Sequence, residues 1–553
     1  MFAIDTIFEN ARFQTMDPSH PWASRIGVYD GKVVALDDDL DGMVARERVD
    51  LGGRYACPGF HDAHLHFSGL GANLSQVDLR PAAAPTMNEL YAKIREAART
   101  TPAGRWILGW GFNQFSLGGF PQRSVLDSIA GDHPVFILHI SNHAAVINSQ
   151  AFRLAGFDDP DAQGDSSLVI RENGRATGLV KDTVCFRIMA MANRADERTL
   201  LHHLRLAADY TLAKGITTFE DAGTGTDRDG NGIGQTPGDI GLFQTAYEQG
   251  LIHQRGILMP YFAAMHDLGE ISTDIPQGFG IDLGLRTGFG GDMLSIGPFK
   301  IILDGAFNSL SAYLKKPYAS DAGNTGVFSW DPEEFKRDVA ILHREGWRMA
   351  VHAIGDRSVD IALDAIENAQ RLYPRADMRH RLEHVGLADD ATVERIIADG
   401  IVPNPQGSFM HDNGDSYLRL LGDERGRRTY RMGAFVHRGA VIPGSTDAPC
   451  APVDPLVSIE GMVTRRTAGG EVLGEDERLT VDEALRAYTY GSAYAAKKED
   501  VLGTLARGKY ADIVALSADP HDVPPDSLHE LCVEQTIIGG IVRYDAGGDA
   551  AQD

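Results

Sequence analysis

Residues 58–66 read PGFHDAHLH, with three histidines in six positions directly after a run typical of a buried strand. On an extended strand, residues two apart lie on the same face, so the imidazoles of His64 and His66 can reach one ion together. Imidazole nitrogens are common ligands of zinc and similar ions. A lone histidine at a strand end is more often a hydrogen-bonded core residue, so this pair alone leaves both interpretations open.

Further polar residues stand in or just after apolar runs much later in the chain. GPFKIILDGA places Lys300 and Asp304 on one strand face, MAVHAIGD contains His352, HRLEHVG contains His384 and PGSTDAP contains Asp447. Strand-end histidines, a carboxylate and a lysine at five separate strands can converge on one site if the strands close into a barrel. The pattern therefore predicts a shared metal site at the carboxyl ends of the strands.

The elements needed to position these residues are visible as alternating patterns. Helical periodicity occurs between several of the apolar runs, and Asp331 before Pro332 is typical of a helix start. Strands that alternate with helices indicate an α/β fold, here a (β/α)8 TIM-like barrel. The expected strands are 56–62, 214–221, 252–259, 296–304, 347–353, 379–385, 400–404 and 440–446.

The remaining segments predict two additions to the barrel. RIGVYDGKVVALDDDL is a strand, an Asp-Gly turn and a strand, and the end of the chain is again rich in strands. We expect both ends to pair in a small β-sandwich, with residues 1–56 plus 497–553 as a composite β domain. The barrel then takes 57–74 plus 191–496, and 75–190 forms an inserted α/β subdomain, because about 150 residues are too many for one crossover.

Composition limits the class of protein and its partners. The net charge of −25 disfavours nucleic acid and anionic membranes as partners, and no apolar run is long enough to span a bilayer. The start, MFAIDTIFENARFQTMDP, has no basic residues before an apolar stretch, so we expect no secretory signal. Four cysteines without a CxxC pair suit a reducing, cytoplasmic location. We expect a small-molecule substrate, and the sequence leaves a homo-oligomer open.

Several motifs together resemble one known family. The chain resembles the amidohydrolase superfamily, in the branch of N-substituted formamide deformylase-like metal-dependent amidohydrolases, over nearly its whole length. The motifs occur in the order of that branch: PGFHDAHLHF, HAAVINSQAF, FKIILDGA, VHAIGDRSVDIALDAIE, HRLEHV, GSTDAP and LTVDEALRAYTYGSAYAAKKEDVLGTLARGKYADIVAL. The resemblance implies a hydrolase with a barrel, a β domain and an insertion.

The resemblance also implies roles for individual residues. The metal ligands are His64, His66, Lys300, His352, His384 and Asp447. A lysine ammonium has no lone pair and cannot bind a cation. In related enzymes the lysine is carboxylated, and its carbamate bridges two ions. We therefore expect one or two divalent ions, with zinc favoured, and a carboxylated Lys300 as the bridging form.

The expected reaction is hydrolysis of a non-peptide C–N bond in an amide, formamide or cyclic amide. Asp447 acts as the general base on a metal-activated water, and a strand-end histidine such as His352 assists at the substrate carbonyl. Three alternatives stay open. The protein could deaminate a ring amine, could use Lys300 as a Schiff base in a lyase, or could bind a metal without turnover.

Candidate substrate contacts are His143, Trp110 and Asp304. After the predicted seventh strand the chain reads VPNPQGSFMHDNGD, where many relatives have Ser-Val-Gln-Pro. Loops at strand ends commonly select the substrate, so the sequence does not predict the substrate itself.

Overall fold

In the computed structural model the chain divides into two compact units, residues 1–67 plus 208–553 and residues 68–207. The structure describes residues 3–81, 83–139, 144–157, 168–192, 196–225, 240–262, 265–269, 278–281 and 284–548. None of the described helices combines the length and the apolar composition that crossing a bilayer requires. The predicted domain boundaries and the predicted β-sandwich stay predictions.

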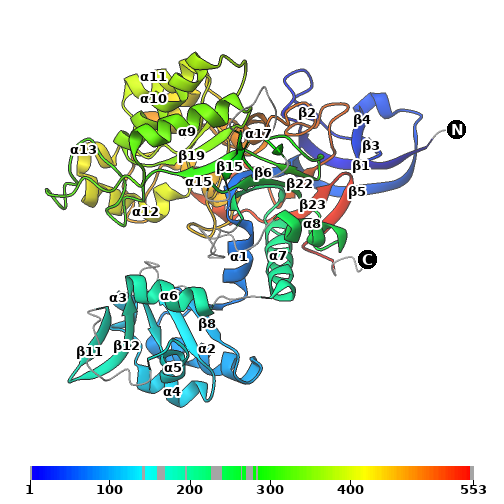
Figure 1. Cartoon of the computed structure of the whole chain (residues 1–553). Helices are drawn as coiled ribbons and strands as arrows, with labels where there is room; N and C mark the ends of the chain where they lie inside the picture. The colour runs from blue at the N-terminus through cyan, green and yellow to red at the C-terminus, as the bar shows by residue number, and fades with distance from the viewer. Residues whose placement is uncertain are drawn as a thin grey trace. The chain divides into compact units, whose positions relative to one another are not determined.

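Both ends of the chain contribute to one sheet in the first unit (Figure 1). The sheet has eight strands in the order β24-β23-β22-β5-β1-β3-β4, with β2 paired to β1. Its bounds are β1 (Ala3–Gln14), β2 (Trp22–Ala23), β3 (Ile26–Tyr29), β4 (Lys32–Leu36), β5 (Val44–Pro58), β22 (Ile513–Leu516), β23 (Val533–Ile538) and β24 (Ile541–Asp545).

The centre of the first unit contains two four-stranded parallel sheets, in the orders β17-β14-β13-β6 and β18-β19-β20-β21. Their strands are almost entirely buried, as parallel strands covered on both faces should be. The bounds are β6 (Phe60–Leu65), β13 (Ile216–Thr224), β14 (Arg255–Pro260), β17 (Leu294–Ile296), β18 (Phe299–Ile302), β19 (Met349–Ala353), β20 (Arg381–His384) and β21 (Val402–Asn404).

Three of the predicted barrel strands differ from the structure. The run at 56–62 is divided between the end of β5 at Pro58, in the eight-stranded sheet, and β6, which begins at Phe60. The run at 296–304 is divided, because Pro298 has no N–H to donate and the N–H of Gly297 bonds Leu258 on β14 at 2.7 Å. The run at 440–446 is not a strand, since the N–H of Gly444 bonds the carbonyl of Ala487 at 2.9 Å instead of a neighbouring strand. The described strands therefore do not close into a barrel, and the predicted eighth strand is wrong.

The segment at 440–448 nevertheless runs beside β6. The carbonyl of Gly444 accepts from the N–H of Ala63 at 3.0 Å, and the N–H of Asp447 donates to the carbonyl of His64 at 2.8 Å. A further bond joins the N–H of His66 to the carbonyl of Ala448 at 2.7 Å. These irregular bonds place Asp447 next to His64 of β6 and His66 just after it, although no regular ladder forms.

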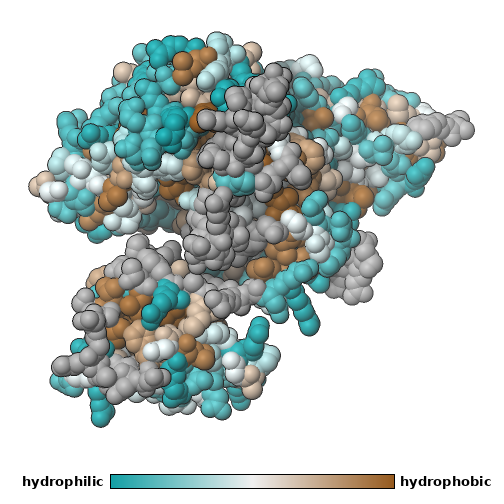
Figure 2. Space-filling view, viewed as in Figure 1, coloured by the Kyte–Doolittle hydropathy of each residue, from teal (hydrophilic) through white to brown (hydrophobic). Residues whose placement is uncertain are grey.

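Helices follow the strands of the second sheet and begin with clear capping signals. The Asp331 carboxylate accepts the N–H groups of Glu333 and Glu334 at 3.0 Å each, which confirms the predicted start of α9. In Figure 2 the area of α9, α10 and α11 shows mainly hydrophilic residues, because the apolar faces of these helices point inward. The helices of this unit include α8 (Ile240–Glu248), α9 (Pro332–Arg344), α10 (Asp356–Leu372), α11 (Asp390–Ala398), α12 (Phe409–Leu421), α13 (Asp423–Gly426), α14 (Met432–Val436), α15 (Pro455–Thr464), α16 (Val481–Arg486) and α17 (Ser492–Ala496).

The second unit is itself an α/β structure. Its six-stranded sheet has the order β11-β12-β10-β9-β8-β7 and carries helices such as α2 (Met87–Thr100), which opens with a Thr86–Glu89 capping box. The strands are β7 (Val77–Asp78), β8 (Ile107–Phe112), β9 (Val135–His139), β10 (Ala144–Ile147), β11 (Val169–Glu172) and β12 (Arg175–Lys181). The other helices are α3 (Gln114–Leu117), α4 (Arg123–Ala130), α5 (Ser149–Leu154) and α6 (Asp182–Ala192), while α1 (Phe67–Leu74) and α7 (Glu197–Leu212) cross the boundaries between the units.

Two buried histidines, His343 of α9 and His380 before β20, form a hydrogen-bonded pair that requires neutral rings. His380 Nδ1 accepts from the N–H of Met349 at 3.2 Å, so its Nε2 carries the proton and donates to His343 Nδ1 at 2.8 Å. His343 Nε2 then donates to the carbonyl of Tyr373 at 2.8 Å. Burial lowers the pKa of both rings. For His380 the pKa falls well below 6.5, because His343 and Arg348 lower it further.

We expect this pair to make folding sensitive to acid. Unfolded histidines take up protons below pH 6.5 whereas the folded rings resist protonation, so stability is present above pH 6.5 and is lost as pH falls further. Each such ring lowers the free energy of unfolding by up to about 1.4 kcal/mol for every pH unit below 6.5. Urea unfolding between pH 7 and pH 5 should show a shallower loss for His343→Gln, which keeps a donor and an acceptor without titrating. The exposed His437 provides a matched control, and an unchanged slope for His343→Gln would contradict this account.

Candidate metal centre

Three side chains from distant parts of the chain come together at the carboxyl ends of the central strands. His64 of β6, His384 of β20 and Asp447 each offer one ligand atom, and these atoms lie within 4.8 Å of one another. All three residues are buried. His64 Nε2 and Asp447 Oδ1 are 3.3 Å apart, close to the separation of about 3.4 Å between two ligands of a tetrahedral zinc ion. This set of two imidazoles and one carboxylate fits a divalent ion.

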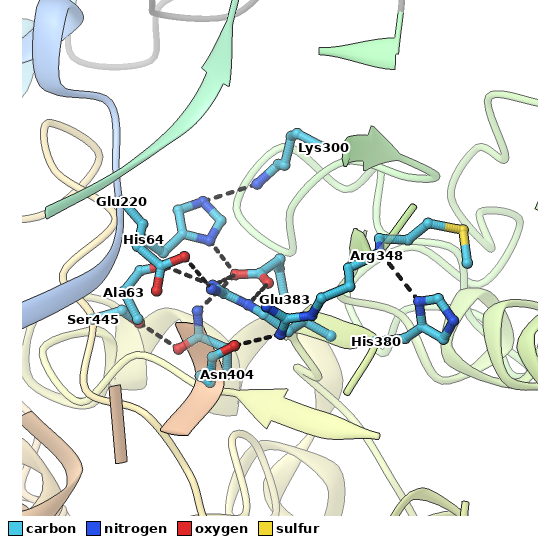
Figure 3. A network of polar contacts seen from close by, with 12 residues as sticks. Ala63, His64, Glu220, Lys300, Arg348, His380, Glu383, Asn404 and Ser445 are labelled. Atoms are coloured by element: carbon cyan, nitrogen blue, oxygen red, sulfur yellow. Dashed lines mark hydrogen bonds and ion pairs between the residues drawn. The ribbon is translucent and has the colours of Figure 1, made fainter. Parts of the chain in front are cut away.

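His66 and Lys300 border this cluster. His66 Nε2 lies 3.3 Å from the same Asp447 oxygen, and Lys300 Nζ lies 2.8 Å from His64 Nε2 (Figure 3). Burial lowers the pKa of Lys300, against the attraction of Glu383 and Asp447. The amine thus occupies the side of His64 that an ion would use, so an ion can bind there only if the amine moves away or is chemically modified.

His352 lies beside the cluster rather than within it. Its ring centroid is 4.4 Å from that of His384, and its Nε2 is 3.3 Å from the carbonyl of Gly305 and 3.6 Å from Asp304 Oδ1. The ring is only partly buried, with 16% of its side chain exposed. His352 is therefore near enough to contact a molecule bound at His384, and its role as a ligand stays a prediction.

The predicted substrate contacts fall in three different settings. Asp304 is buried and accepts the N–H groups of Tyr313, Ile354 and Gly355 at 2.8 to 3.0 Å, and burial raises its pKa to about 6. Trp110 belongs to the second unit, where the guanidinium of Arg80 stacks 4.7 Å from its ring centroid. His143 lies outside the described residues. The roles of these three residues in substrate binding stay predictions.

The backbone at two of the three clustered residues is in the left-handed region. His384 has φ 74°, the following Val385 has φ 45°, and Asp447 has φ 58°. Only a few per cent of residues other than glycine adopt these angles, among which asparagine, aspartate and histidine do so most often, and residues in this region are concentrated at functional sites. The strained backbone turns both side chains at the points where their strand-like segments end.

Burial keeps the imidazoles of His66 and His384 neutral, whereas for His64 the effects of burial and Lys300 are outweighed by Glu383 and Asp447, which raise its pKa. Burial lowers the pKa of His384 to about 3 and lowers that of His66 as well, so both rings are neutral and each has a lone pair available for a ligand bond. Behind them, Asp62 accepts from the N–H and hydroxyl of Thr446 and from the N–H of His64, while burial raises its pKa to about 7. Asp62 thereby joins β6 to the segment that carries Asp447.

A buried ionic network supports His64 and was not predicted from the sequence. Glu383 accepts a hydrogen bond from His64 Nδ1 (Figure 3). Arg381 donates to both Glu383 oxygens at 2.8 and 3.0 Å. Arg381 also donates to Glu220 at 2.7 Å and to the carbonyl of Ala63 at 2.6 Å. Glu220 lies 3.4 Å from His61 Nε2, so His61 faces this network rather than the cluster. The sequence signal that could have indicated this network is the pair of charged residues in HRLEHV, Arg381 and Glu383, within an otherwise buried strand.

Comparisons with known proteins agree with this site. A model of the amidohydrolase family matches residues 47–544. The chain is 29% identical to YtcJ of Bacillus subtilis over 91% of this chain and 92% of that protein. It is 28% identical to an N-substituted formamide deformylase of Arthrobacter pascens, over 98% and 99% of the two chains.

Among solved structures, a metal-dependent hydrolase from Pyrococcus furiosus is similar, with a TM-score of 0.73 and 27% identity over 93% of this chain and 99% of that one. Together with the two parallel sheets and their helices, the likeness indicates a TIM-barrel-like α/β fold. Similarity to metal-dependent hydrolases fits a buried set of two imidazoles and a carboxylate. The chain therefore belongs to the amidohydrolase family, and it is an enzyme that hydrolyses amide-type bonds.

Proposed function

We propose that this enzyme is a metal-dependent hydrolase that cleaves a non-peptide C–N bond in a small amide, formamide or cyclic amide. The observation that carries the proposal is the buried cluster of His64, His384 and Asp447, whose donors fit zinc with a position left for water or substrate. The likeness to a formamide deformylase supports this class of bond. We expect a cytoplasmic protein that acts without nucleic acid or membrane partners and that can form homo-oligomers.

Asp447 is the residue best suited to move protons. A bound divalent ion supplies Lewis acidity that lowers the pKa of water and polarises a carbonyl. Asp447 Oδ1 is held 3.3 Å from the Nε2 atoms of both His64 and His66, and 9% of the Asp447 side chain is exposed. Asp447 accepts a proton from the attacking water and returns it to the departing amine. His352 contacts the substrate carbonyl, and Asp304, His143 and Trp110 contribute to substrate binding.

The number of ions depends on the chemical form of Lys300. As an amine, Nζ competes for His64 Nε2 and the cluster suits one ion. As a carbamate, Lys300 would offer two oxygens that share one negative charge, and His66 and His352 would be the residues available to hold a second ion. We propose the carboxylated form and zinc as the metal, because imidazole and carboxylate donors favour zinc.

Metal content tests the centre directly. Protein purified without chelator or nickel affinity should contain about two equivalents of zinc or a similar ion by inductively coupled plasma mass spectrometry. Lys300→Met should contain about one, because the bridging oxygens are lost while the three-residue cluster stays. Absence of metal in the wild type after incubation with zinc and bicarbonate would reject the proposal and favour a Schiff-base role for Lys300, which borohydride trapping would then detect.

Asp447→Asn should lower turnover by about 10²–10⁴-fold on any compound that the wild type hydrolyses, because the amide cannot accept the proton. A panel of N-substituted formamides, cyclic amides and ring amines, followed by amine and ammonia release, separates amide hydrolysis from deamination. The exposed Asp526→Asn is the matched control and should keep full activity. Undiminished turnover by Asp447→Asn would remove Asp447 as the general base.

A further inference from the structure

The nitrogens of His64 and His384 that face away from the cluster meet a wall of buried polar side chains. His64 Nδ1 contacts Glu383, and His384 Nδ1 contacts Gln406 Oε1 at 2.7 Å. Four side chains line this wall, each with 0% exposure, namely Glu383, Asn404, Gln406 and Ser445. They come from β20, from β21 and the residues after it, and from the segment at 440–448. Buried polar groups at such a density require complete hydrogen bonding.

The wall is one continuous chain of hydrogen bonds, part of which is visible in Figure 3. Asn404 Nδ2 donates to Glu383 Oε2 at 2.6 Å, and Asn404 Oδ1 accepts from the Ser445 hydroxyl at 2.8 Å. Gln406 Nε2 donates to Ser445 Oγ at 3.0 Å and to the carbonyl of Asn404 at 2.8 Å. The Nδ1 atoms of His64 and His384 are therefore joined through four side chains.

Counting donors and acceptors fixes the direction of every bond. Gln406 uses both amide hydrogens on Ser445 and on the carbonyl of Asn404, so its oxygen is left to accept from His384 Nδ1. An ionised Glu383 can only accept, so His64 Nδ1 must donate to it. Both rings thus carry a proton on Nδ1. The Nε2 of His384 is then left for the cluster, and the Nε2 of His64, which Lys300 Nζ contacts at 2.8 Å, becomes available to an ion once the amine moves away or is modified.

We propose that Gln406, Ser445 and Asn404 are positioning residues which, with Glu383, fix the tautomer and orientation of both histidines for metal binding. The inference rests on the proposed metal-dependent function. The two histidines are supported unequally, since His64 donates to a carboxylate that Arg381 holds ionised and His384 donates to a neutral amide. A carboxylate raises the basicity of an imidazole more than an amide does, so His64 is the stronger ligand and His384 the more replaceable one.

The positioning role assigns a function to the segment after β20, where the sequence differs from many relatives. Asn404 and Gln406 belong to VPNPQGS, a stretch expected from its location to select the substrate. Their side chains are instead fully buried and hydrogen-bonded within the wall. Their identities therefore affect metal affinity before they affect substrate choice.

The experiment compares Gln406→Met and Gln406→Glu with the wild type. Met fills similar volume but cannot accept from His384, so the ring loses its fixed tautomer. Glu keeps a strong acceptor for His384 Nδ1 but removes the two amide hydrogens that Gln406 donates to Ser445 and Asn404. The dissociation constant of the apoprotein for Zn²⁺, measured by competition with a chromophoric chelator, should rise about 10–100-fold for Gln406→Met. Gln406→Glu should lie closer to the wild type, and the visible spectrum of bound Co²⁺ should shift for Gln406→Met.

Gln254→Met is the matched control, because Gln254 is an equally buried glutamine that bonds Ala208 and Thr211 rather than this wall. It should change neither the Zn²⁺ dissociation constant nor the Co²⁺ spectrum. Ser445→Ala removes a single hydroxyl and replaces Gln406→Met in the Zn²⁺ binding experiment if that variant does not fold. It should weaken Zn²⁺ binding less than Gln406→Met is expected to, because each imidazole keeps its immediate acceptor.

The outcomes separate the two proposals. A wild-type protein that binds no Zn²⁺ or Co²⁺ would reject the metal-dependent function. Tight binding by the wild type with an unchanged dissociation constant for Gln406→Met, or for Ser445→Ala where that variant is used, would reject the positioning role alone. Equal weakening by Met and Glu at position 406 would also reject it, since a purely structural glutamine has no reason to be rescued by a carboxylate.

Discussion

An imidazole that offers one nitrogen to an ion carries its proton on the other, and inside a protein that proton needs an acceptor. This requirement organises the centre of the molecule. His64 needs the carboxylate of Glu383, the carboxylate needs the charge of Arg381, and Arg381 in turn is balanced by Glu220. Each member is fully buried, so removing one leaves a charge without a partner, which in buried ionic networks costs about 3–5 kcal/mol.

The clustered residues were predictable because their signals are local. His-x-His on a strand fixes two imidazoles on one face whatever the rest of the chain does, and the strand ends of a parallel α/β fold lie at one edge. The supporting residues were not predictable in this way. Glu383 is adjacent in sequence to His384 yet bonds His64, which lies 319 positions away. Side-chain bonds across such separations follow only from the packed structure.

The same distinction explains the errors in the strand predictions. Val441 and Ile442 favour a strand locally, but Pro443 and Gly444 follow them, and Gly444 bonds both the backbone of Ala487 and the hydroxyl of Ser492. Those partners belong to the region of α17, far along the chain, and they outweigh the local β propensity. The loss of regular pairing also has a use, because it frees the backbone at Asp447 to adopt the left-handed conformation that brings its carboxylate to His64.

Charge balance links the state of Lys300 to the number of ions. Around His64, the carboxylates of Glu220, Glu383 and Asp447 face one guanidinium and one ammonium, which leaves one excess negative charge in a buried region. One divalent ion changes this excess to a single positive charge. Carboxylation of Lys300 replaces the ammonium with an anion, after which two divalent ions give the same single positive charge. Two ions beside a free ammonium would leave three excess positive charges, whereas one ion beside a carbamate would leave one excess negative charge. Because uncompensated charge is costly where water is excluded, a second ion should bind only where the lysine is modified.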